Sequence, residues 1–368
     1  MRITVDAQAL ADTLSKCVAP RNHANQAVQH ALMRIVEGEL QISTTDLVTT
    51  MVSHLACTTE GDQIVDGGYM PRVDMLRHAL FGLEGDVVLD EGESFLFAGR
   101  RRFPLDHWDP NLFPVADKMA FKTLDCDPLE LKQGLQSVKY AADKDNIEKP
   151  WANGVYLGGG YAVATNSFRM ATQAIDSLKL EDGVIVPSQT VQRVIDALNE
   201  DSQVHLLKHP GSKIFQALKV VNPNGELRTQ LLGTAYPTWT NAAAEQETLD
   251  WHVQFSIKEA RPVLNRLMKF VEMKTGKYTV YKCRVSGGDN ELRFDPMITT
   301  NKGVHEFIPC HHEGEIPDFG MNADNINDVL TQMNDKGDVL TWHGSPKSVQ
   351  VFTSESSNCT HYVMPLRD

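Results

Sequence analysis

The feature that most constrains this chain is an internal repeat. Residues 1–120, 121–248 and 249–368 can be laid over one another, and each stretch begins with a short alternating strand that runs into an amphipathic helix. The strand and helix pairs are expected at 3–5 and 6–18, at 120–124 and 128–142, and at 251–255 and 257–273. A chain that repeats one unit is expected to fold that unit each time, so we predict three similar domains with these boundaries.

A second helix follows a strand at the equivalent place in each repeat. Residues 70–80, 186–198 and 321–330 carry apolar side chains at three and four spacing, as one buried helix face requires. The remaining segments alternate with period two and are joined by turn sequences such as Glu37-Gly38-Glu39 and Lys336-Gly337-Asp338. Each domain is therefore predicted to be α+β, with two helices packed on antiparallel sheets.

The first helices of the second and third repeats combine an apolar face with a polar or basic one. At 100° per residue, Val263, Leu264, Leu267, Met268 and Val271 share one side of the third-repeat helix, and Lys258, Arg261, Asn265, Arg266 and Lys269 share the other. Lys132, Gln136 and Lys139 align similarly in the second repeat. Such stripes suit either an ordinary solvated helix face or a DNA-facing surface. Pro262 predicts a late start or a kink in its helix.

Composition limits the function classes. The chain has 35 basic and 48 acidic residues and a net charge of -13, which argues against a simple basic-surface nucleic-acid binder. No apolar run is long enough to span a bilayer, and the first residues do not form a basic and apolar leader, so we expect a cytoplasmic protein rather than a membrane or secreted one. The six cysteines form no Cys-x-x-Cys pair and are expected to be reduced thiols.

The usual signatures of enzymes are missing from the sequence. There is no Walker A loop, His-Glu-x-x-His, Gly-x-Ser-x-Gly or Gly-x-Gly-x-x-Gly motif. Cys310-His311-His312 could ligate a metal, but neighbours on a strand point to opposite faces, so no metal site is predicted.

Several short segments together resemble the bacterial DNA polymerase III beta subunit, the sliding clamp. They are Thr45-Asp46-Leu47, Arg102-Phe103, Asn153-Gly154, Ala164-Thr165-Asn166-Ser167-Phe168-Arg169-Met170, Val184-Ile185-Val186-Pro187, Tyr236-Pro237 and Tyr362-Val363-Met364-Pro365-Leu366-Arg367. They occur in the family's order over the full length. The combination is specific, although each match alone is weak.

The resemblance implies the DNA clamp fold and a head-to-tail homodimer that closes into a six-domain ring around double-stranded DNA. It implies sequence-independent DNA binding through the helix stripes, while the acidic outer surface repels DNA. The implied partners are the polymerase III alpha subunit, the clamp loader, and other polymerases and repair factors that carry clamp-binding peptides. It implies no catalytic residue, no cofactor and no metal.

The resemblance also implies a hydrophobic groove between the second and third domains that receives partner peptides. The positions that match it are Ala152, Thr165, Ser167, Phe168, Arg169, Met170, Pro237, Tyr278, Ser348, Tyr362, Val363, Met364, Pro365, Leu366 and Arg367. Asn166-Ser167-Phe168 replaces the Asp-Gly-His usual in the family, and Asn241 stands where many members have Arg. A different peptide preference is therefore expected.

Candidate DNA contacts and ring contacts complete the predicted sites. The DNA candidates are Arg21, Arg72, Lys132, Lys139, Lys144, Lys149, Trp151, Arg193, Lys258, Arg261, Arg266 and Lys269. Trp151 could stack on an exposed base or be an ordinary packing residue. Phe103 and Leu105 are the candidates for the ring interface, with membership of the domain core as the alternative. The competing function is a clamp-like scaffold or competitor that binds replication partners without encircling DNA.

Overall fold

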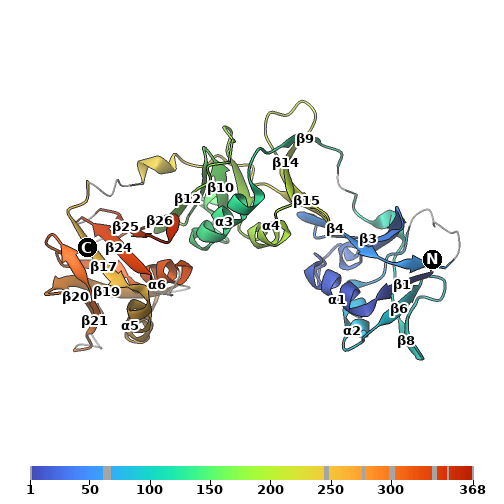
Figure 1. Ribbon diagram of the computed structural model, residues 1–368, viewed down its shortest axis with the longest axis horizontal. Helices are drawn as coiled ribbons and strands as arrows, with labels where there is room; N and C mark the ends of the chain where they lie inside the picture. Colours follow the sequence, from blue (N-terminus) through green and yellow to red (C-terminus); the bar gives the residue numbers. More distant parts are fainter. Residues whose placement is uncertain are drawn as a thin grey trace. The chain divides into compact units, whose positions relative to one another are not determined.

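The computed structural model divides the chain into two compact units. The first comprises Met1–Leu129 and Arg193–Leu231, and the second comprises Glu130–Gln192 and Leu232–Asp368 (Figure 1). The structure describes residues 2–60, 68–115, 117–243, 248–275, 278–297, 303–333, 338–345 and 348–366, without the side chains of 274, 275, 278 and 279. Within these ranges, no helix is long and apolar enough to cross a membrane.

Two antiparallel sheets form the first unit. The seven-stranded sheet has the order β2 (Leu32–Val36), β3 (Glu39–Thr45), β4 (Thr49–Ala56), β16 (Gly225–Gln230), β15 (Ala217–Asn222), β14 (Gln203–Lys208) and β9 (Ala120–Thr123). The five-stranded sheet has the order β5 (Thr58–Thr59), β1 (Arg2–Asp6), β6 (Asp86–Asp90), β7 (Phe95–Ala98) and β8 (Arg101–Pro104). Helices α1 (Ala7–Lys16) and α2 (Val73–Leu80) contact each other and bury Leu10, Leu14 and Leu76 in the core.

The second unit also contains two sheets. The nine-stranded sheet has the order β13 (Val184–Pro187), β10 (Gly154–Gly158), β11 (Tyr161–Thr165), β12 (Arg169–Ala174), β26 (Ser357–Val363), β25 (Gln350–Ser354), β24 (Val339–Gly344), β17 (Trp251–Ser256) and β22 (His311–Glu313). The other sheet joins β18 (Glu272–Thr275), β19 (Tyr278–Gly288), β20 (Glu291–Pro296) and β21 (Glu306–Pro309), and β23 (Phe319–Asn322) also pairs with β19. Helices α5 (Ile257–Val271) and α6 (Ala323–Gln332) lie against each other (Figure 1).

The middle repeat contributes to both units. Its strands β9 and β14 to β16 extend the first unit's sheet, and its strands β10 to β13 extend the second unit's sheet. Its helices are α3 (Pro128–Val138) and α4 (Val191–Ala197). Two strand pairs therefore join neighbouring repeats: β4 with β16, here called the first seam, and β12 with β26, the second seam. The three-domain division itself remains a prediction.

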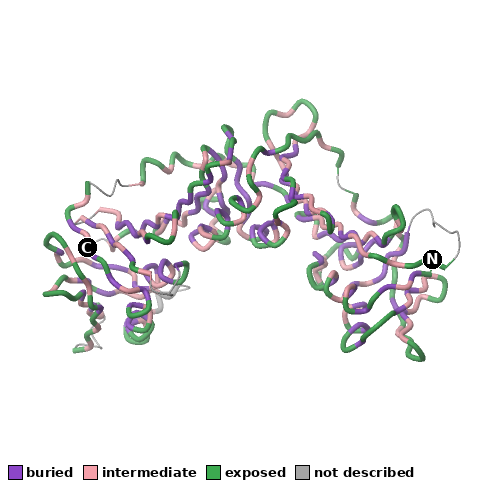
Figure 2. Tube along the Cα trace, in the orientation of Figure 1, coloured by how far each residue is buried: buried purple, intermediate pink, exposed green. Residues whose placement is uncertain are grey.

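The predicted class, α+β with helix pairs on antiparallel sheets, is confirmed. Burial alternates along strands such as β1 and β17, while β13 is buried throughout, and the helices keep one exposed face (Figure 2). The starts of the second helices were predicted too early, because the buried run at 184–187 forms β13 and residues 319–322 form β23. The expected late start at Pro262 is also wrong, since α5 begins at Ile257 and continues through the proline.

Two arginines that are distant in sequence donate hydrogen bonds to the C-terminal carbonyl groups of helices α1 and α6. Arg77 of α2 donates from Nε to Leu14 O at 3.0 Å and also reaches Cys17 O, at the end of α1. Arg261 of α5 donates from Nε to Leu330 O at 3.1 Å and also reaches Met333 O, at the end of α6. The last carbonyls of a helix lack partners within it, so each guanidinium satisfies oxygens that would otherwise need water.

Candidate functional site

The two seams share a turn of the same construction. In the first, Thr45 Oγ1 donates to Thr49 O and accepts from Leu47 N, while Asp46 Oδ1 accepts from Val48 N and Thr49 N. In the second, Thr165, Asn166, Ser167, Phe168 and Arg169 make the same set of bonds in the same order. Leu47 and Ser167 both adopt positive φ, 73° and 76°, so the backbone fold of the turn is equivalent.

The chain that leaves each seam returns to this turn. Gln230 N, at the end of β16, donates to Val48 O at 3.0 Å, and Met364 N, just after β26, donates to Phe168 O at 2.8 Å. Farther along the second seam, Leu366 N donates to Gly320 O at 2.8 Å, which fixes the tail against β23. The predicted terminal segment at 362–366 is therefore bound to the predicted turn at 165–169.

The seams differ in the side chains that meet on their shared face. Arg228 lies opposite Thr50 in the first seam, whereas Tyr362 lies opposite Met170 in the second. Met170 and Tyr362 form a buried cluster with Val163 and Val351. The first seam is polar at the position where the second is apolar.

Aromatic side chains line the apolar cluster of the second seam. Tyr236, Trp239, Leu249 and Val349 pack against the cluster. Tyr236 stacks on Tyr156 with ring centroids 4.8 Å apart, and Trp239 lies edge-on to Tyr161 at 5.2 Å. Phe168 is 66% exposed and Met364 is 39% exposed, which leaves apolar surface available to a ligand. We call this the second-seam surface.

Of the predicted groove residues, Met170 and Tyr362 lie in the apolar cluster and Met364 bonds to Phe168, and the whole predicted set differs in accessibility. Phe168, Pro237 and Met364 are exposed, Thr165, Ser167, Arg169, Ser348, Pro365 and Leu366 are half-buried, and Ala152, Met170, Tyr362 and Val363 are buried. Arg367 lies outside the described residues, and the side chain of Tyr278 is not among those described. Sequence reasoning missed Tyr156, Trp239 and Val349, whose apolar character was visible but whose proximity was not.

Arg169 is held inside the protein rather than presented to solvent. Its side chain is 15% exposed, pairs with Asp328 of α6 and donates to Tyr140 O at 3.0 Å. Its guanidinium also lies 5.5 Å from the centre of the Tyr140 ring. Burial lowers the pKa of Arg169, while nearby Tyr140 and acidic groups oppose that shift. Arg169 therefore supports the turn that carries Phe168.

A buried histidine continues this network. Tyr140 Oη lies 2.7 Å from His361 Nδ1, and the two rings are 5.7 Å apart. Burial lowers the pKa of His361 to about 4, so the imidazole is neutral near pH 7. Burial also raises the pKa of Tyr140 well above its ordinary value, so the phenol keeps its proton.

The third-repeat stripe retains fewer accessible cations than its sequence suggests. Val263, Leu264, Leu267 and Val271 are buried as predicted, and Lys258, Arg266 and Lys269 are exposed. Arg261 caps α6, as described above. Arg266 makes two bonds to Glu306, at 3.0 and 2.9 Å, and the hydrogen bond to that carboxylate raises the arginine's pKa. Lys258 and Lys269 remain the exposed lysines of this stripe.

The remaining DNA candidates are spread over several environments. Arg72 pairs with Asp74 at 2.8 Å, and Arg193 pairs with Asp46 at 3.2 Å. Lys149 Nζ donates to Ser167 Oγ at 2.9 Å, and Trp151 lies edge-on to Tyr236 at 5.7 Å. The others are Lys132, which is half-buried, Lys139, which bonds to Gln192, and Arg21 and Lys144, which are exposed. Lys149 and Trp151 therefore also belong to the surroundings of the second-seam surface.

The two ring-interface candidates lie near a sheet edge. Phe103 is half-buried on β8 and packs partly against the first unit's core, while Leu105 is buried within that core. β8 ends its five-stranded sheet, and β21 ends a sheet in the second unit. Arg101 and Arg102 lie on β8, and Glu306 lies on β21.

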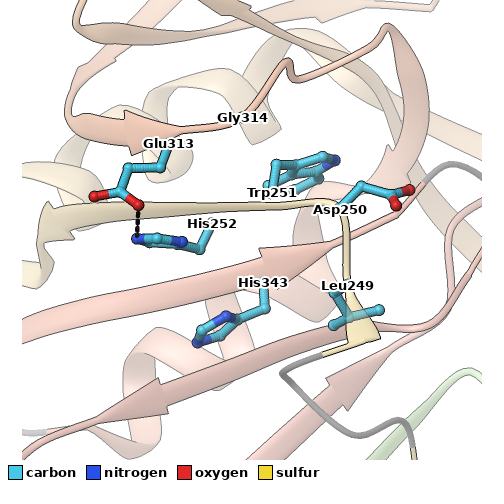
Figure 3. Close-up of a pocket in the computed structure, with 7 residues that line it drawn as sticks. All are labelled: Leu249, Asp250, Trp251, His252, Glu313, Gly314 and His343. Carbon is cyan, nitrogen blue, oxygen red and sulfur yellow. Dashed lines mark ion pairs between the residues drawn. The ribbon is translucent and has the colours of Figure 1, made fainter.

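A separate polar pocket lies on β17, β22 and β24, with a volume of about 440 Å³ (Figure 3). His252 and His343 face each other across neighbouring strands with ring centroids 5.7 Å apart, and Glu313 Oε2 lies 3.8 Å from His252 Nε2. Burial, with His252 nearby, lowers the pKa of His343. Over the described part of the chain, no group of three or more His, Cys, Asp or Glu side chains is arranged to hold a metal ion.

This fold is that of the DNA sliding clamps. The sliding clamp of Caulobacter crescentus DNA polymerase matches with a TM-score of 0.83 at 20% identity, covering 100% of both chains. The DNA polymerase III beta subunit of Pseudomonas aeruginosa matches with a TM-score of 0.83 at 18% identity, again over 100% of both chains. That of Thermotoga maritima matches with a TM-score of 0.81 at 19% identity, over 100% of this chain and 99% of the other.

The particular fold is therefore that of the bacterial DNA polymerase III beta subunit, from the first repeat to the last. The resemblance predicted from short segments is confirmed at the level of structure. Neither protein-family models nor curated proteins match the sequence.

Proposed function

We propose that this protein is a DNA sliding clamp, a non-catalytic processivity factor that acts in the cytoplasm. Two copies associate head to tail into a ring around double-stranded DNA, and the second-seam surface binds short peptides of the polymerase III alpha subunit, the clamp loader, and other polymerases and repair factors. The full-length likeness to solved clamps supports the ring. The contrast between the two seams supports the peptide site.

That contrast carries the proposal. The same turn and the same returning chain occur at both seams, so the backbone alone does not distinguish them. Met170 and Tyr362 provide an apolar base in the second seam, where Thr50 and Arg228 stand in the first. An apolar peptide bound at the second seam removes the exposed surface of Phe168 and Met364 from water, and the deformable thioether of Met364 can adapt to related peptides.

The DNA interaction is proposed to be weak and independent of sequence. Exposed Lys258 and Lys269 can approach phosphates, whereas Arg261, Arg266 and Arg193 already have protein partners. Retention by a closed ring does not need strong phosphate binding, because the ring must open before it can leave the DNA. Sliding is then favoured by the lack of base-specific contacts.

The pairing of these arginines with protein groups favours a second candidate function, a clamp-like scaffold that binds replication partners without encircling DNA. The paired arginines leave few accessible cations on the helices, and α6 carries Asp324 and Asp328 but no Lys or Arg. A ring that forms and is loaded onto circular DNA would exclude this alternative. A peptide-binding chain that never stimulates a polymerase in the presence of a matched loader would favour it.

Equivalent substitutions in the two turns test the peptide site. Phe168 and Val48 occupy the same turn position and are both exposed, so Phe168→Glu and Val48→Glu place the same charge at corresponding places without disturbing a core. With a dye-labelled apolar clamp-binding peptide from a replicative polymerase, fluorescence anisotropy is expected to show at least a tenfold weaker Kd for Phe168→Glu. Tenfold corresponds to about 1.4 kcal/mol. The Kd for Val48→Glu should stay within twofold of the wild-type value, and equal effects of the two variants would refute the peptide site.

A further inference from the structure

Within the described residues, the first strand of the middle repeat, β9, is paired on one side only. The strands β1, β9 and β17 precede the first helix of their repeats. β1 lies between β5 and β6, and β17 lies between β22 and β24. β9 pairs with β14 on one side, and no strand among the described residues lies on its other side (Figure 1).

The side chains of β9 are open to solvent. All four residues, 120–123, are exposed, and Phe121 is 69% exposed (Figure 2). The Phe121 ring lies edge-on to His205 at 5.2 Å, and Thr123 Oγ1 lies 3.1 Å from His205 Nδ1, so one face of the strand is supported by its neighbour. Ile214, in the loop that follows β14, is 68% exposed. A free edge thus lies beside exposed apolar side chains.

Four lysines lie along the same edge, with Asp117 before β9 and Asp125 after it. Lys118 precedes β9, Lys122 lies on it, and Lys208 lies on β14 opposite Ala120. Lys213 lies in the loop with Ile214. None of these four lysines forms an ion pair with a carboxylate within the described ranges.

We propose that β9 binds an extended acidic peptide of a partner protein, which adds a strand to the seven-stranded sheet. The free N–H and C=O groups of β9 would pair with the peptide backbone. Lys118, Lys122 and Lys213 provide charge complementarity to Asp or Glu side chains, while Phe121 and Ile214 contact apolar side chains in between. This site is distinct from the second-seam surface and does not depend on the sliding-clamp proposal.

Lysines on an edge strand can also serve only to prevent aggregation, and the experiment must separate the two roles. The probe is a dye-labelled decapeptide of alternating glutamate and valine, titrated against the full chain by fluorescence anisotropy. A matched probe carries N-methyl groups at alternate backbone nitrogens, which removes hydrogen-bond donors and retains the charge. Saturable binding that weakens at least tenfold with the methylated probe is expected.

Charge-reversal variants locate the site. The double variant Lys118→Glu with Lys122→Glu is expected to raise the Kd of the probe at least tenfold. The control, Lys16→Glu with Lys179→Glu, changes the net charge equally at exposed positions elsewhere, and its Kd should stay within twofold of the wild type. An unlabelled apolar groove peptide should not displace the probe. The proposal is overturned if the probe does not saturate, if both double variants behave alike, or if methylation has no effect. Displacement by oligo(dT) without a methylation effect would assign the surface to single-stranded DNA instead.

Discussion

His361 shows how one buried residue makes the stability of the second seam depend on pH. Its neutral imidazole lies against Tyr140 Oη, and the Arg169 guanidinium lies 5.5 Å from the centre of the same tyrosine ring. Burial lowers the pKa of His361 from 6.5 to about 4, because a charged imidazole would lose its hydration there. Protonation therefore opposes folding at this position.

The sign of the pH effect follows from that difference. The unfolded chain takes up the proton near pH 6.5, before the folded chain does, so the stabilising contribution is complete above pH 6.5 and is lost as the pH falls toward 4. The lost contribution is about 3 kcal/mol at pH 4. Urea unfolding between pH 7.5 and 4.5 should show this loss in the wild type, and His361→Gln should show a shallower slope. An unchanged slope in the variant would show that other groups are responsible.

At the scale of elements, both seams rely on close approach between strands of different repeats. Gly225 opens β16 at φ +141°, and a Cβ built there would lie 2.0 Å from Val52 O and 2.9 Å from Ser53 Cα. These are backbone atoms of β4, which cannot rotate away. The first seam therefore requires glycine at this position for a tertiary reason as well as a conformational one.

Two alanine substitutions separate these reasons. Gly225→Ala and Gly211→Ala both place a methyl group at positive φ, but nothing lies within 4 Å of the site at Gly211. Gly211→Ala should lower the free energy of unfolding by about 1 kcal/mol, as expected from backbone strain alone. Gly225→Ala should lower the free energy of unfolding by about 2 kcal/mol more than Gly211→Ala does, because the strands β4 and β16 must separate. Urea denaturation measures both, and equal losses would mean that β4 adjusts freely.

At the scale of the whole molecule, the proposed ring uses exposed sheet edges. β8 presents Arg101 and Arg102, and β21 carries Glu306. Glu306 is already bound by Arg266, so the unpaired strand edges rather than opposite charges suit a contact between the first repeat of one copy and the third repeat of the next, which closes by rotation rather than extending.

Sedimentation equilibrium tests that assembly. Two chains of 41.0 kDa give 82.0 kDa, and we expect this mass to persist to nanomolar concentration. Arg101→Glu, on the exposed edge of β8, should raise the dimer Kd at least tenfold, while Lys16→Glu should not change it. A mass of 41.0 kDa at all concentrations would exclude the encircling mechanism and leave the scaffold function.

Much of the fold could be predicted from the sequence, because its evidence is local. Apolar spacing located both helices of each repeat and the buried face of α5. Helix starts at 70, 186 and 321 were placed too early, because the buried residues before each helix have no periodicity that separates a strand end from a helix start. The segment resemblance located the turn at 165–169 and the tail at 362–366.

By itself, the sequence determined the repeat, the class of fold and the residue types available at each seam, because these depend on order and spacing along the chain. Only the tertiary structure decided which partners those residues meet. Arg261 and Arg77 cap distant helices, Arg169 is held by Asp328, and Tyr362 lies on Met170. Such contacts join residues far apart in sequence, and their energies depend on burial and geometry that no local pattern encodes.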